Sequence, residues 1–200
     1  QRAVRDKRYL YIRNYMPYVP WGQKLTYLWK MEATRAWEDW HRAGKTDAVT
    51  GRWFREKPPE ELYDTWEDPD NVVNLIDDPK YSKITDEFRG ALKNWQLKVR
   101  DCGLLPECER VKRAADLGIT VYEMAKDEKH YDIQSYLDAS EFVLRAKPEQ
   151  VPALLEMLSH KDSGIRYWGM TGLCLLGDNA RSHIPSIRKM TNDSSDAVRA

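Results

Sequence analysis

The hydrophobic pattern at the start of the chain predicts extended structure. Residues 4–13 are rich in β-branched and aromatic side chains with partial alternation, which is typical of strands. The polar step Asp6-Lys7 divides them, so we expect two short strands joined there. Residues 14–23 contain two Pro and one Gly among three aromatic residues. Because Pro removes donors from a ladder, this segment is predicted to be an aromatic-rich loop.

Three- and four-residue spacing of apolar side chains then predicts a helix from Leu25 to Ala43. Gly44 supplies the left-handed residue that commonly ends a helix. The helix carries a stripe of tryptophans, which we assign to the core in preference to a binding platform: Trp29, Trp37 and Trp40.

A second extended segment is predicted around Leu62-Tyr63, with Pro58-Pro59 as a rigid lead-in. Two Asp-Pro steps follow and indicate turns, because Pro disfavours helix at the residue before it. A long helix from Tyr81 to Arg100 comes next, with its apolar residues on one face. Shorter helices are expected at 107–117 and 132–145.

The last quarter of the chain repeats itself at an offset of 33 residues. "VPALLEMLSHKDSGIR" aligns with "IPSIRKMTNDSSDAVR", so that Pro152 falls on Pro185 and Arg166 on Arg199. Each copy is typical of a helix, a polar turn and a second helix, and the pattern resembles a HEAT repeat. We expect the Arg of each copy to bond to a turn carboxylate such as Asp162 or Asp196. Because a lone helical pair cannot bury its apolar face, such units stack.

Composition allows a core and argues against two classes of partner. Hydrophobic residues make up 42% of the chain, and 32 basic residues balance 32 acidic ones. A net charge near zero is not typical of a nucleic-acid binder. No apolar run approaches the roughly 20 residues of a membrane helix, so we expect no membrane span. The charges are segregated, however: residues 1–24 are basic and residues 55–79 are acidic. This pattern favours either a polyanionic ligand at the basic segment or two solvated faces.

An ordered set of short motifs resembles the C-terminal subdomain of the sulfatase family, within the alkaline-phosphatase-like superfamily. "VRDKRY" is followed by "ELYD", by "EDPDNVVNL" and then by a helix that contains a Trp. The set looks most like the sulfamidase (heparan N-sulfatase) type and covers roughly residues 1–107. The resemblance implies export to the periplasm or the extracellular space, and a parent enzyme that uses calcium and a formylglycine.

The formylglycine of this family forms within Cys/Ser-x-Pro-x-Arg, and no cysteine of this chain lies in that motif. The family's metal-binding Asp/Asn set also belongs upstream. We therefore expect no catalytic residues and no cofactor in this chain, which should be inactive alone. Its partner would be an upstream catalytic domain of the same protein.

Substrate contact is the role that this subdomain can still supply. The loop region combines aromatic side chains, which stack on sugar rings, with an Arg, whose planar head binds sulfate or carboxylate with two bonds. The candidate contacts for a sulfated glycan are Arg13, Asn14, Tyr18 and Trp21. The structural alternative is that Tyr18 and Trp21 cover the Trp-rich helix.

Three further groups of residues are candidate chemical sites. The acidic residues between Asp68 and Asp78 lack the register of a calcium loop, so we interpret them as scaffold. The four histidines are scattered and predict no zinc site. Cys102 and Cys108 flank a short segment, so either a disulfide, as in exported proteins, or two free thiols is expected there.

The predicted fold class is α+β: a small antiparallel sheet packed by the 25–43 and 81–100 helices, followed by an all-α, HEAT-like segment. The expected division is a sulfatase-like subdomain at 1–106, helical linkers at 107–147 and repeats at 148–200. The expected function is that of the C-terminal part of a sulfatase, with the repeats available to a protein partner. The alternative is a non-catalytic HEAT-repeat interaction module. The chain is interpreted as a fragment, because it begins inside a strand pattern and stops inside a helix pattern.

Overall fold

The computed structural model describes residues 1–200, which form two compact units, Gln1–Leu92 and Lys93–Ala200. The chain is α+β, as predicted: the N-terminal unit contains the sheet and the C-terminal unit is helical. The division falls within helix α3 (Ser82–Val99), whereas the sequence suggested a boundary near residue 106. No helix has both the length and the apolar character needed to cross a bilayer.

The sheet has three antiparallel strands in the order β1-β2-β3. Strands β1 (Arg2–Arg5) and β2 (Tyr9–Arg13) form the hairpin predicted around Asp6-Lys7. Strand β3 (Glu60–Asp64) pairs with β2, with Leu10 opposite Tyr63 and Tyr11 opposite Leu62. The pairing expected between these two stretches, distant in sequence, is therefore confirmed.

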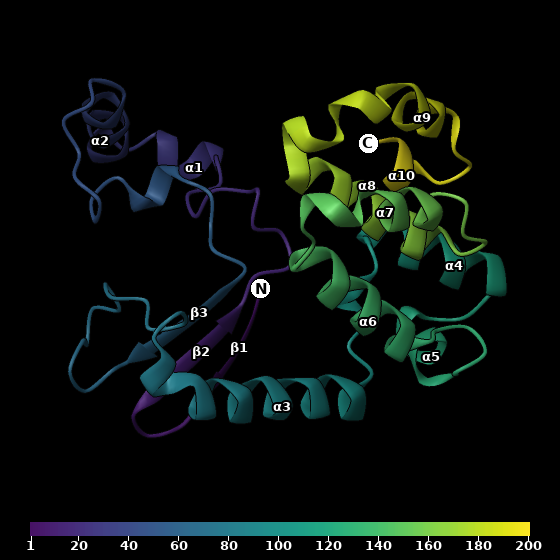
Figure 1. Cartoon of the computed structure of the whole chain (residues 1–200), viewed down its shortest axis with the longest axis horizontal. Helices are drawn as coiled ribbons and strands as arrows, with labels where there is room; N and C mark the ends of the chain where they lie inside the picture. Colours follow the sequence, from purple (N-terminus) through teal and green to yellow (C-terminus); the bar gives the residue numbers. More distant parts are fainter. The chain divides into compact units, whose positions relative to one another are not determined.

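One face of the sheet is covered by the first part of α3, as Figure 1 shows. Its core consists of four buried side chains: Tyr11, Leu62, Phe88 and Leu92. Burying a residue such as Leu62, which is 0% exposed, contributes roughly 1.5–3 kcal/mol. The residues before α3 close the free edge of β3, because the Leu75 amide donates to the Leu62 carbonyl at 2.8 Å. The "DPDNVVNL" stretch therefore works as a structural corner.

The predicted 25–43 helix is broken in two, and it does not pack on the sheet. Helix α1 (Thr26–Trp29) and helix α2 (Glu32–Arg42) are separated at Lys30-Met31, where Met31 is extended. The Arg35 guanidinium donates to the carbonyls of Trp29 and Lys30, both at 2.9 Å, and so satisfies the end of α1. Gly44 has φ +68°, as its place after α2 predicted.

The tryptophan stripe is not a core, contrary to the sequence-based assignment. No residue of α2 is fully buried, and Trp40 is 44% exposed. Trp37 instead stacks on Trp53, with ring centroids 5.8 Å apart, and meets Phe54 edge-on. The reason is that α2 packs against α1 and the short 3₁₀ segment Arg52–Phe54, and these leave much of its surface exposed. Figure 1 shows α1 and α2 away from the strands.

The C-terminal unit consists of short packed helices. The predicted helices are present as α4 (Glu107–Leu117) and α6 (Ile133–Leu144), and the sequence analysis missed α5 (Val121–Lys126). Helices α7 (Val151–Met157) and α8 (Ser163–Leu176) form the first copy of the 33-residue repeat. The second copy gives α9 (Ile184–Lys189) and α10 (Asp196–Arg199), and α8 packs against α6, α7 and α10.

The turn carboxylates pair differently from the expectation for the first copy. Arg166 bonds to Asp193 in the turn of the second copy, at 2.7 Å. Asp162 accepts instead from Arg113 on α4, at 2.9 Å, and from the Tyr136 hydroxyl on α6, at 2.8 Å. In the second copy Arg199 does bond to Asp196. The first Arg therefore links consecutive copies through Asp193, and it also bonds to carbonyl groups of its own turn, those of His160 and Lys161.

Candidate functional site

The aromatic-rich loop 14–23 is fastened along the segment that leads into β3. Three backbone hydrogen bonds join the two segments: Asn14 to the Pro59 carbonyl (2.9 Å), Lys57 to the Pro17 carbonyl (3.0 Å) and Gly22 to the Trp53 carbonyl (2.8 Å). An antiparallel bridge between Pro20 and Glu56 lies between them. The loop is therefore held at both ends and in its middle, and this order fixes where its side chains point.

Arg13 is buried in the structure, with 1% of its surface exposed. It stands opposite Glu60 in the β2–β3 register, so both side chains lie on the face that α3 covers. Its Nη1 is 3.6 Å from Glu60 Oε1, and its guanidinium lies 6.0 Å from the ring centroid of Tyr15. Protein atoms cover the guanidinium in this arrangement. Its contact with sulfate stays a prediction.

Glu60 collects donors from both neighbouring elements. The Tyr11 hydroxyl donates to its Oε1 at 2.6 Å, and Arg89 on α3 donates to both carboxylate oxygens at 2.7 Å. Burial disfavours the charged carboxylate, but the bonds from Arg89 and Tyr11 outweigh burial and lower the pKa of Glu60 to about 2. Glu60 is thus a fixed negative charge between the sheet and α3.

Glu61, the next residue, projects to the opposite face of β3, because side chains alternate along a strand. It is 0% exposed and accepts from Asn14 Nδ2 and from the Tyr63 hydroxyl, both at 2.5 Å. Burial raises the pKa of Glu61, and the two hydrogen bonds oppose that rise without cancelling it. Asn14 also donates to the Pro58 carbonyl at 2.8 Å, so its amide ties the start of the loop to β3.

The two aromatic candidates are more accessible than Arg13 and Asn14. Tyr18 and Trp21 are half-buried, and the Arg52 guanidinium lies 5.5 Å from the ring centroid of Trp21. Next to Trp21, Gly22 allows the Trp53 indole to approach, because a Cβ on Gly22 would lie 1.9 Å from Trp53 Nε1. The structure therefore separates the four candidates into a buried polar pair and a partly exposed aromatic pair on one loop.

The sequence analysis missed Glu60, Glu61 and Arg89, which hold this arrangement together. A signal was present, since two carboxylates begin a strand whose next two residues are apolar and buried. Only pairing with β2 and packing of α3 show which partner each carboxylate has. Chemically the group is an internal ion-pair and hydrogen-bond network, and it contains no exposed nucleophile with an adjacent base.

The acidic corner has no arrangement suited to calcium. No group of three or more His, Cys, Asp or Glu side chains is placed to hold a metal ion. Asp68 accepts from the Val73 amide at 2.8 Å and thereby shapes the turn after β3. The residues of this chain thus do not fit the calcium that the family resemblance implies for the parent enzyme.

Of the two alternatives for Cys102 and Cys108, the structure contains the free thiols; Cys174 is also free. Cys102 begins a 3₁₀ turn, and Cys108 lies in α4, where it is exposed.

Part of the chain is similar in sequence to a known enzyme. The chain is 35% identical over 113 residues to an ulvan-active sulfatase of Formosa agariphila. The match covers 56% of this chain but only 19% of that sulfatase. No family model matches the chain, and no solved structure matches it. A region of the chain is thus related to a sulfatase, and the chain spans about a fifth of that relative's length.

Proposed function

We propose that this chain is the C-terminal part of a sulfatase that acts on a sulfated carbohydrate. The observation that carries the proposal is the 35% identity to an ulvan-active sulfatase over 113 residues. The antiparallel sheet and the helix α3 that packs on it follow the order that the sequence motifs suggested, and this supports the proposal. The reacting groups, including the formylglycine and the calcium of the sulfatase family, would come from a catalytic domain outside these 200 residues. Export to the periplasm or the extracellular space belongs to the same proposal.

Within such an enzyme, the N-terminal unit would be scaffold and would offer the loop 14–23 to the substrate. Arg13 and Asn14 are buried against Glu60 and Glu61, so they would position the loop. Tyr18 and Trp21 would then supply ring faces for a sugar, since both are partly exposed. This division gives the buried pair a structural role and leaves the contact to the aromatic pair.

Sulfate release tests the activity. The complete protein encoded by the gene would be incubated with a panel of sulfated polysaccharides that includes ulvan, and free sulfate would be measured by ion chromatography. We expect release by the complete protein and none by residues 1–200 alone. A complete protein that releases no sulfate from any member of the panel contradicts the proposal.

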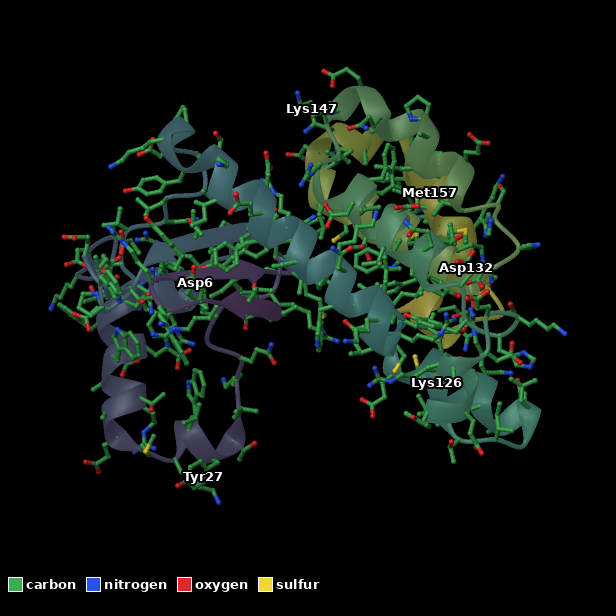
Figure 2. All side chains as sticks on the ribbon, turned by 90° about the horizontal axis from the view of Figure 1, so that it is seen from below. Asp6, Tyr27, Lys126, Asp132, Lys147 and Met157 are labelled. Atoms are coloured by element: carbon green, nitrogen blue, oxygen red, sulfur yellow. The ribbon has the colours of Figure 1, made fainter.

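Substitutions in the complete protein test the loop. Tyr18→Ala and Trp21→Ala should each raise KM roughly three- to tenfold, because a lost aromatic contact costs about 0.5–1.5 kcal/mol. Tyr27→Ala is the matched control, since Tyr27 is 77% exposed on α1 and points away from the sheet (Figure 2). An unchanged KM in both loop variants would remove the loop from substrate binding without affecting the assignment of the activity.

A second proposal concerns the C-terminal unit. The 33-residue repeat forms two consecutive helical pairs, α7–α8 and α9–α10, joined by the Arg166–Asp193 ion pair. This arrangement favours HEAT-type repeats that bind a protein partner, either beside the sulfatase function or in place of it. Inactivity of the complete protein, together with a stable protein complex formed through this unit, would favour the interaction module.

A further inference from the structure

An exposed tryptophan stands at one end of the sheet, where two turns meet. The turn between β1 and β2 contains Lys7 and Arg8, and the turn after β3 contains Thr65 and Trp66. Thr65 donates its amide and its hydroxyl to the Arg8 carbonyl, both at 2.8 Å. The Trp66 indole donates to the Lys7 carbonyl at 2.9 Å, yet 64% of Trp66 is exposed. The ring is thus held in orientation while most of its surface faces solvent.

Arg8 supports the ring from beside it. Its guanidinium lies 5.4 Å from the Trp66 ring centroid, within the range of a cation–π contact. The same guanidinium forms a forked ion pair with Asp64, with distances of 2.9 Å from Nε and 2.6 Å from Nη2 to Oδ2. The Asp64 side chain is 3% exposed, so it fixes Arg8 from the protein side.

The charges that reach solvent around this ring are mostly positive. Lys7 is exposed and forms no ion pair, and 37% of the Arg8 side chain is exposed. The Asp6 carboxylate accepts hydrogen bonds from the backbone amides of Arg8 and Tyr9, at 2.7 and 2.6 Å. These bonds, together with the charge of exposed Arg5, lower the pKa of Asp6. Glu67 is the exposed carboxylate that faces Arg8, at 3.8 Å. An anion approaching the ring meets exposed Lys7 and the exposed part of Arg8, and the carboxylates of Glu67 and Asp6 oppose it.

We propose that Lys7, Arg8 and Trp66, called here the Trp66 platform, bind a sulfated saccharide. The indole face stacks on the apolar face of a sugar ring, and the ammonium of Lys7 pairs with one of its sulfate groups. Neither the platform nor its residues belong to the loop 14–23. The inference rests on the proposed function for its ligand class, and it adds a second contact surface in the same unit.

Binding to the whole chain tests the platform without any catalysis. The probes are size-fractionated ulvan oligosaccharides and a chemically desulfated sample of the same fraction, titrated by isothermal calorimetry at two salt concentrations. Trp66→Ala should weaken binding about fivefold, since stacking contributes about 1 kcal/mol. Lys7→Glu should weaken binding and reduce its salt dependence. Glu67→Gln should strengthen binding roughly two- to threefold, because it removes the opposing charge.

Trp40→Ala is the matched control, because Trp40 is 44% exposed in the same unit but lies on α2. It should bind like the parent chain, and circular dichroism should show all variants folded. The inference is overturned if Trp66→Ala binds as the parent does, if the desulfated sample binds equally well, or if the chain binds neither probe. If Trp66→Ala weakens binding but the complete protein releases no sulfate, only the proposed activity is contradicted. If the complete protein releases sulfate but Trp66→Ala binds as the parent does, only the platform is contradicted.

Discussion

Arg166 of α8 forms a forked ion pair with Asp193, the residue after the 3₁₀ turn that follows α9. Its Nε and Nη2 atoms donate to the two carboxylate oxygens, both at 2.7 Å. Both side chains are largely buried, at 12% and 8% exposure, and Nη1 also donates to the carbonyls of His160 and Lys161. One guanidinium thus fastens two successive turns of the repeat, and burial of both charges makes each partner costly to remove.

Removing Arg166 should destabilise the C-terminal unit. Arg166→Ala leaves the Asp193 carboxylate buried without its cation, and we expect the free energy of unfolding to fall by roughly 2–4 kcal/mol. Arg166→Lys should recover only part of the loss, because an ammonium cannot form two parallel bonds. Urea denaturation followed by circular dichroism measures both variants.

Arg181→Ala is the control, since Arg181 and Asp178 are 3.9 Å apart and both exposed. Its free energy of unfolding should change by no more than about 0.5 kcal/mol. An equal effect of Arg166→Ala and Arg181→Ala would contradict the assigned role.

Gly22→Ala should loosen the loop 14–23, because the added Cβ would overlap the Trp53 indole at 1.9 Å. Relief requires the ring or the backbone to move, which typically costs about 1–3 kcal/mol. Gly90→Ala in α3 is the matched control: nothing lies within 4 Å of the position where its Cβ would be, so a stabilisation of about 0.5–1 kcal/mol is expected. Thermal unfolding compares the two. Similar melting temperatures for the two variants would show that the loop does not need the Gly22–Trp53 contact.

Acid stability should depend on the pair of Glu60 and Arg89. The pKa of Glu60 is lowered to about 2 from 4.5, so the stability that its charge contributes is present above pH 4.5 and is lost as the pH falls towards 2. Arg89→Met removes the main donor while Glu60 stays buried, so its pKa should rise and acid unfolding should begin at higher pH. Carbon-detected NMR titration of Glu60 and unfolding between about pH 2 and 6 give the two readouts.

Asp86→Asn is the control for this pair. Asp86 also bonds to Arg89, at 2.8 Å, but 71% of its side chain is exposed. We expect this variant to follow the parent acid profile closely. A Glu60 pKa that stays near 2 in Arg89→Met would refute the explanation.

Glu61 should show the opposite linkage. Burial raises its pKa, so the stability linked to its proton is present below the ordinary value of 4.5 and is lost as the pH rises through the folded pKa. Glu61→Gln removes the charge, keeps one acceptor oxygen for Asn14, and places an amide N–H that can donate to the Tyr63 hydroxyl oxygen, so stability at neutral pH should be equal or higher. Glu61→Leu leaves both partners buried and unbonded and should cost roughly 2–4 kcal/mol. Denaturant unfolding at neutral pH compares them, and a Gln variant as unstable as the Leu variant contradicts this role.

Thiol counting tests the state of the cysteines. The structure has three free thiols, of which Cys108 and Cys174 are exposed. We expect three equivalents of a thiol reagent to react with the denatured chain without reductant, and the two exposed thiols to react first in the folded chain. A count of one without reductant would show that two of the three cysteines are bridged, and peptide mapping would then show whether they are Cys102 and Cys108.

Local sequence patterns predicted much of the order of helices and strands. Partial alternation around Asp6-Lys7 predicted the β1–β2 hairpin, and helical spacing predicted α3, α4 and α6. One failure occurred where a side chain bonded to the backbone of its own predicted helix. The 25–43 helix has continuous apolar spacing, but Arg35 satisfies the carbonyls of Trp29 and Lys30, and the helix breaks there.

By itself the sequence determined which segments are extended or helical, because periodicity, Pro and Gly act over a few residues. Only the tertiary structure decided the roles of the charged side chains. Arg13 and Asn14 suggested an exposed ligand site, but β2–β3 pairing places them against Glu60 and Glu61 in the interior. The physical reason is that a charge can be buried only beside its partner, and that partner lies more than forty residues away in the sequence.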